Sequence, residues 1–170
     1  MLAENRAFRR AKQAAKRQLQ QLSLPQELSL GTLQATVELE RNISITVQAA
    51  GPDADPLVTG SVLFTDSHAV ITYPADASPH RKNKILCHEF AHLIFGHVQT
   101  EAVGGISDDM TKMLALLDPD MVKAQLLRRR CFDSPAELEA EVLADMFSVR
   151  LTWSSALRAP TPDSFGRVFG

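Results

Sequence analysis

The sequence predicts a single α+β domain in which helices at both ends of the chain enclose a small sheet. Apolar residues recur with helical spacing over the first 41 residues and again in the second half of the chain. Residues 43–47 instead alternate apolar and polar side chains, which is typical of a half-buried strand, and two more strands are expected before residue 74. No repeat or linker divides the 170 residues, which are enough for one domain with its own core.

The composition limits the classes of protein to which this chain can belong. Hydrophobic residues make up 45% and charged residues 22%, as in ordinary globular domains. The net charge of −2 gives no general attraction to nucleic acid or to an anionic membrane. There is no apolar run of about 20 residues and no signal-peptide pattern. Two cysteines make no disulfide framework. We therefore expect a cytoplasmic protein with no membrane partner and no direct nucleic-acid binding.

Residues 1–41 are predicted to form a helical N-terminal segment. The first helix spans residues 3–22 and is strongly basic, and we interpret it as a solvated helix docked by one narrow apolar stripe. A contact surface for an acidic partner or DNA is the weaker alternative. Pro25 ends this pattern, and Ser29 is the expected N-cap of a second helix that ends near Arg41.

Three strands are predicted at residues 43–47, 57–65 and 68–73. Asp66 and Ser67 form a tight turn between the second and third strands, so these two strands should pair as an antiparallel hairpin. We therefore expect a small, three-stranded and mainly antiparallel sheet.

The next helix has signals at both of its ends. Ser78 is the expected cap, Pro79 occupies the first helical position, and Gly96 closes the helix.

Further helices are predicted beyond this one. They span residues 110–117, 118–130 and 134–153, and the sheet should pack on the helix that starts at Pro79 and on the last of these. Residues 159–170 are expected to form a loosely held tail.

The helix that starts at Pro79 contains the sequence His88-Glu89-Phe90-Ala91-His92, which has H-E-x-x-H spacing. Residues four apart lie on one face of a helix, so His88 and His92 can reach the same metal ion. Glu89 flanks that face and is the candidate catalytic base. The surrounding residues are strongly apolar, and buried polar groups need partners. We therefore interpret the motif as a zinc site and not as a solvent-facing cluster.

Catalytic zinc usually has three protein ligands, so the two histidines need a third residue. In a continuous helix His97 is turned to nearly the opposite side from His88, and we interpret it as a structural residue at the helix end. The alternative source is a carboxylate on the last helix. There Glu137, Glu141 and Asp145 share one stripe.

The spacing of these acidic residues does not decide among them. Glu139 points away from the stripe, and Glu137 also fits a capping box that begins at Ser134. The whole stripe is equally compatible with a solvated acidic face.

The H-E-x-x-H segment is followed by Glu141-Val142-Leu143-Ala144-Asp145-Met146-Phe147, and the combination resembles the ImmA/IrrE family of zinc metallopeptidases. That family has an H-E-x-x-H helix and then a helix with an E-x-x-A-(N/D)-x-F-A motif. The resemblance covers roughly residues 71–151, and Ser148 stands where the family often has Ala. It implies a zincin-like, gluzincin-type fold, with residues 43–153 as the core and Zn²⁺ as the cofactor.

The same resemblance implies roles for individual residues. Glu141 is the expected third ligand, with Glu137 as the fallback one turn earlier. Asp145 would accept a hydrogen bond from a ligand histidine and fix its tautomer. Glu89 would take a proton from the attacking water and deliver it to the departing amine. Tyr73 is a candidate oxyanion donor, although a packing role explains it as well.

The resemblance also implies a class of partner. We expect a regulatory endopeptidase that cuts a protein such as a helix-turn-helix repressor or an antitoxin-like regulator. An exposed strand edge would bind the substrate in extended form, and residues 68–72 are the candidate edge. The alternative is a zinc-containing binding module that sequesters a transcriptional regulator without cutting it. A metal-free structural domain is a third, weaker interpretation.

Overall fold

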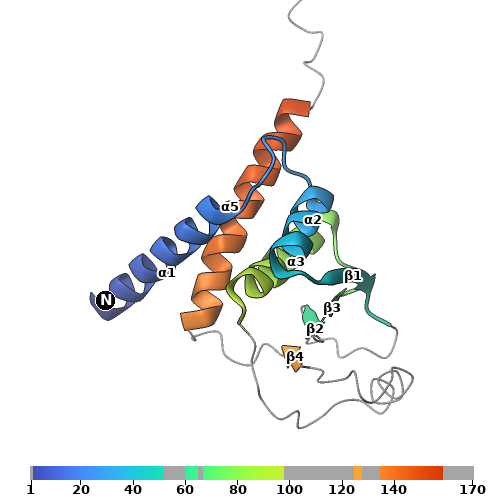
Figure 1. Cartoon of the computed structure of the whole chain (residues 1–170), viewed down its shortest axis with the longest axis horizontal. Coiled ribbons are helices and arrows are strands. Elements are labelled where there is room, and N and C mark those ends of the chain that lie inside the picture. Colours follow the sequence, from blue (N-terminus) through green and yellow to red (C-terminus); the bar gives the residue numbers. More distant parts are fainter. Residues whose placement is uncertain (1, 52–59, 65–66, 98–124, 128–134, 159–170) are drawn as a thin grey trace, which may run out of the picture.

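The computed structural model describes residues 2–51, 60–64, 67–97, 125–127 and 135–158, and these form an α+β domain (Figure 1). The helices are α1 (Leu2–Gln21), α2 (Leu30–Arg41), α3 (Pro79–Phe95) and α5 (Pro135–Arg158). The strands are β1 (Ser44–Ala49), β2 (Ser61–Phe64), β3 (His68–Tyr73) and β4 (Gln125–Leu127). The predicted tail at residues 159–170 and the predicted helix at 110–117 lie outside the described residues.

The two N-terminal helices form where the sequence predicts them. α1 lies along α5 (Figure 1) and buries a narrow stripe that includes Ala11 and Ala15, while its arginines stay exposed. Ser29 caps α2 by accepting a hydrogen bond from the backbone N–H of Thr32, whose hydroxyl accepts in return from the Ser29 N–H. Across the described residues, no helix is long and apolar enough to cross a bilayer.

The sheet is mixed, so the expectation of a mainly antiparallel sheet is wrong. The strand order is β1-β3-β2-β4. β2 and β3 form the predicted antiparallel hairpin, but β1 pairs with β3 in parallel, with Ile45 opposite Ala69 and Val47 opposite Ile71. Parallel strands need a crossover connection. The segment between β1 and β3, which contains β2, supplies this crossover. The alternation of apolar and polar residues within one strand does not reveal whether that strand pairs in parallel or antiparallel.

β4 lies where a helix was predicted over residues 118–130, and this prediction is wrong for residues 125–127. Leu126 pairs with Leu63 of β2 in an antiparallel ladder. A short apolar run fits a helix or a strand equally well, and here the hydrogen bonds offered by β2 decide.

The central position of β3 corrects the expected substrate edge at residues 68–72. β3 is paired with β1 on one side and with β2 on the other. Within the described residues, β1 and β4 are the strands at the edges of the sheet.

α3 is the central helix of the domain and lies between α5 and the sheet (Figure 1). Residues 85–94 are all buried, because α2, α5 and β3 contact this helix from different sides. A surface helix would bury only one stripe. Any polar side chain in this segment therefore lies inside the protein and needs a polar partner.

Ser154 of α5 fixes the loop before α2, since its hydroxyl accepts a 2.8 Å hydrogen bond from the buried N–H of Leu28. We expect Ser154→Ala to lower the free energy of unfolding by about 1–3 kcal/mol, because the N–H loses this acceptor. Urea denaturation measures the change. Ser155→Ala is the control: its exposed hydroxyl bonds to the Thr152 carbonyl of the same helix, and we expect a change below about 0.5 kcal/mol. Equal losses in both variants would contradict the assigned role.

Candidate metal centre

The ends of α3 confirm the predicted caps. The Ser78 hydroxyl accepts from the backbone N–H of Arg81, and Pro79 occupies the first turn. Gly96 adopts a left-handed conformation with φ of 68°. The N–H groups of Gly96 and His97 bond to the carbonyls of Leu93 and His92. This pattern is a Schellman motif, which turns the chain back along the helix.

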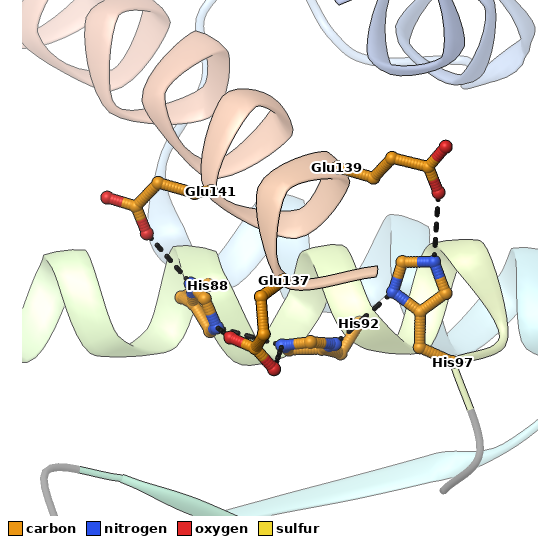
Figure 2. A network of polar contacts seen from close by, with 6 residues as sticks. All are labelled: His88, His92, His97, Glu137, Glu139 and Glu141. Atoms are coloured by element: carbon orange, nitrogen blue, oxygen red, sulfur yellow. Dashed lines mark hydrogen bonds and ion pairs between the residues drawn. The ribbon is translucent and has the colours of Figure 1, made fainter. Parts of the chain in front are cut away.

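The two histidines of the H-E-x-x-H segment and one carboxylate of α5 converge inside the protein (Figure 2). His88 and His92 are 4% and 5% exposed, and their Nε2 atoms are 2.8 Å apart. The Glu137 carboxylate lies against both rings, with one oxygen 3.3 Å from Nε2 of His88 and the other 3.3 Å from Nε2 of His92. These three residues lie close enough to hold a metal ion.

The separations of these atoms are of the size that a metal site needs. Bonds of about 2.0–2.1 Å from zinc to nitrogen or oxygen imply that neighbouring ligand atoms in a tetrahedral site lie about 3.3–3.4 Å apart. Each Nε2 atom lies 3.3 Å from a different oxygen of Glu137, and the two Nε2 atoms, 2.8 Å apart, would have to move slightly further from each other. Two imidazoles and a carboxylate also form a ligand set found in catalytic zinc sites, which leaves a fourth position for water or substrate.

Glu141 and Asp145 occupy different places from those expected. Glu141 contacts the other ring nitrogen of His88, with its oxygen 3.1 Å from Nδ1, and its side chain is 54% exposed compared with 13% for Glu137. Glu141 therefore makes the outer hydrogen bond that was expected of Asp145. Asp145 is exposed and makes no contact with either histidine among the described residues.

The crossing of α5 over α3 selects which acid faces the two Nε2 atoms. Glu137 and Glu141 share a face of α5 and are separated by one turn, about 6 Å along the axis. The first turn of α5 lies over His88 and His92 (Figure 2), so the geometry favours Glu137 as the third ligand.

Glu137 carries the charge that a metal ligand needs. Burial raises the pKa of its carboxyl, but hydrogen bonds and charge interactions with His88 and His92 outweigh burial and hold the pKa well below its usual range. Glu137 is therefore ionised at neutral pH.

His97 also lies at the site. Its contact with His92 was not predicted, because the prediction treated His97 as part of a continuous helix. Its Nδ1 lies 3.3 Å from Nδ1 of His92, and its Nε2 lies 3.2 Å from an oxygen of Glu139. Burial and the neighbouring His92 lower the pKa of His97, and Glu139 and Glu137 only partly oppose them. The Schellman turn at Gly96 is the signal that could have found it, because that motif folds the chain back toward His92.

Cys87, the residue before His88, is fully buried in the core. Burial raises the pKa of its thiol to about 11, and a hydrogen bond with Ser148 of α5 only partly opposes this. The thiolate needed for metal binding or nucleophilic attack is therefore disfavoured. Ser148, the departure from the family pattern, makes a contact between α3 and α5.

The hydroxyl of Tyr73 is hydrogen-bonded to Lys82, near the start of α3. The Lys82 ammonium donates a 3.0 Å hydrogen bond to it and lies 4.3 Å from the centre of its ring. Lys82 precedes His88 by about 9 Å along the helix axis. The role of Tyr73 as an oxyanion donor stays a prediction.

Glu89 is 2% exposed and lies beside Gly60, the residue before β2. A Cβ at residue 60 would lie 2.9 Å from Oε1 of Glu89 and 2.6 Å from Cγ2 of Ile85. The backbone at Gly60 thus forms one wall of the space that Glu89 occupies.

We expect Gly60→Ala to displace the Glu89 carboxylate and to cost about 1–3 kcal/mol of unfolding free energy, as overpacked sites do. Thermal and urea denaturation measure the cost. Gly51→Ala is the control, since a Cβ there meets no atom within 4 Å. A Gly60→Ala protein as stable as the control would show that residue 60 does not confine Glu89.

Comparison of this chain with family models, curated proteins and solved structures finds no match.

Proposed function

We propose that this chain is a zinc-dependent metallo-endopeptidase with a zincin-like, gluzincin-type core, similar to the ImmA/IrrE family. The observation that carries the proposal is the position of the Glu137 carboxylate, which contacts Nε2 of both His88 and His92. The site combines the ligand set of a catalytic zinc centre with a glutamate, Glu89, next to the first ligand in the sequence.

The residues of the chain divide the chemistry of peptide hydrolysis between them. Zinc held by His88, His92 and Glu137 would supply a Lewis acid that acidifies water and polarises a carbonyl. Glu89 takes a proton from the attacking water and returns it to the departing amine. Glu141 accepts a hydrogen bond from Nδ1 of His88, which leaves Nε2 of that ring unprotonated for the metal.

We also propose that the substrate is a protein, and that cleavage is regulatory and directed at a transcriptional regulator. Support comes from the resemblance to ImmA/IrrE peptidases, which extends over both motif helices. The mixed sheet moves the candidate binding edge from β3 to β1 or β4, where an extended peptide can add as a further strand.

Two measurements test the proposal. Metal analysis of the purified full chain should find one zinc ion per chain, and incubation with a proteome-derived peptide library should produce new termini that a chelator suppresses. A chain without zinc overturns the proposal. A chain that carries zinc, cuts no peptide and still binds a transcriptional regulator would instead be the binding module.

A further inference from the structure

Both ring nitrogens of His88 and of His92 make polar contacts, and the Nδ1 atoms of the two rings have different partners (Figure 2). Nδ1 of His88 contacts Glu141, and that carboxylate is 54% exposed. Nδ1 of His92 contacts Nδ1 of His97, whose Nε2 contacts Glu139. The side chains of His97 and Glu139 are 14% and 30% exposed, so this second arm is the better shielded from water.

The ring protons of His97 and His92 can be assigned by starting from Glu139, the last residue in this series of contacts. An ionised carboxylate only accepts, so Nε2 of His97 must donate to Glu139. In a neutral imidazole the other nitrogen is then an acceptor, so Nδ1 of His97 receives a hydrogen bond from Nδ1–H of His92. In the zinc-loaded chain this would leave Nε2 of His92, which lies beside Glu137 and Nε2 of His88, unprotonated and able to bind the metal.

We propose that Glu139 and His97 are positioning residues that together fix the ring tautomer of His92 and so raise the affinity of the centre for zinc. The inference rests on the proposed zinc site and deepens it. Outer hydrogen-bond partners of ligand histidines orient the ring and raise its basicity. In this chain the carboxylate acts through an intermediate histidine, which follows the C-terminal cap of α3, while the carboxylate itself comes from α5.

The surroundings of His97 hold it in the orientation this arrangement needs. The Schellman turn at Gly96 brings the residue back beside His92. The ring stacks on Phe95, with centroids 4.9 Å apart and planes 2° apart. A purely structural role is the competing explanation, in which the pair of His97 and Glu139 only ties the end of α3 to α5.

Zinc affinity separates the two explanations. The full chain is stripped of metal and titrated with Zn²⁺ against a chromophoric chelator. We expect His97→Phe, which keeps the stacking on Phe95, to weaken zinc binding about 10–100-fold. His97→Asn keeps an acceptor for His92 and should restore most of the affinity.

The carboxylate is tested in the same titration. Glu139→Gln should weaken binding about 10-fold and should add nothing further in the His97→Phe background, because the two residues act in series. Exposed residues outside the centre provide matched controls, and His80→Asn and Glu40→Gln should bind zinc as the unmodified chain does.

Nitrogen NMR gives a readout that a structural tie would not change. In the zinc-loaded chain, two-bond proton–nitrogen correlations should show a protonated Nδ1 on His92 and a protonated Nε2 with a bare Nδ1 on His97. The opposite tautomer of His97 overturns the inference. Glu139→Gln should produce a mixture of the two tautomers, since an amide can either accept or donate.

The outcomes distinguish this inference from the proposed function. Undiminished zinc affinity in His97→Phe, with zinc bound to the unmodified chain, overturns the inference and leaves the metal centre in place. A chain that binds no zinc overturns both. If circular dichroism shows that His97→Phe does not fold, the isosteric and partly exposed Glu139→Gln decides.

Discussion

Glu137→Ala is expected to lose zinc under conditions in which Glu141→Ala retains it. Glu137 presents its two oxygens 3.3 Å from the Nε2 atoms of His88 and His92, so its removal deletes a metal ligand. Glu141 touches only the outer nitrogen of His88, and loss of such a partner costs about 10–100-fold in affinity. We therefore expect Glu137→Ala to weaken binding by more than about 100-fold.

The two variants form a matched pair, because both remove a glutamate from the same face of α5. Metal analysis after dialysis and competition titration with a chelator measure the difference. Loss of zinc in Glu141→Ala together with retention in Glu137→Ala would contradict this placement. It would show that α5 is shifted along its own axis by one turn, so that Glu141 faces the two Nε2 atoms. Circular dichroism of the two metal-free proteins controls for misfolding.

Glu89→Gln is expected to keep zinc and to lose hydrolysis. The amide has nearly the shape of the carboxylate, so it fits the same space beside Gly60, but it cannot take a proton from water. A positioned general acid–base group contributes about 10²–10⁴-fold in rate, and we expect a loss of that size. Mass spectrometry of new peptide termini, with the unmodified chain and the Glu89→Gln variant run side by side, measures it.

Three further observations complete the Glu89 experiment. Glu27→Gln, an exposed substitution of the same chemistry, should cleave as the unmodified chain does. A Glu89→Gln protein that retains its full biological effect would favour sequestration of a regulator over cleavage. Loss of zinc in this variant would show that Glu89 supports the metal centre directly.

Helix boundaries and caps were predictable because their signals are local. Ser29, Ser78 and Gly96 act on backbone groups within four residues of themselves, and each caps its helix as predicted. The hairpin of β2 and β3 is local for the same reason. The parallel pairing of β1 with β3 depends on a crossover between distant segments, so alternation within each strand could not reveal it.

β4 and His97 show how a periodic pattern fails at its ends. Residues 125–127 form a strand because β2 offers an unpaired edge, which the apolar run itself does not encode. His97 was assigned to the far side of α3 by extending the helix beyond its predicted last residue. The left-handed Gly96 stops that rotation and returns the ring to His92.

The sequence by itself determined that His88 and His92 share a face, because four residues make about one helical turn whatever surrounds them. It also placed Glu137, Glu141 and Asp145 on one stripe of the last helix as candidates for a third ligand. Only the tertiary structure brought Glu137, and not Glu141, against both Nε2 atoms, because that depends on where α5 crosses α3. A shift of one turn along the same stripe leaves the sequence pattern unchanged but moves a carboxylate by about 6 Å.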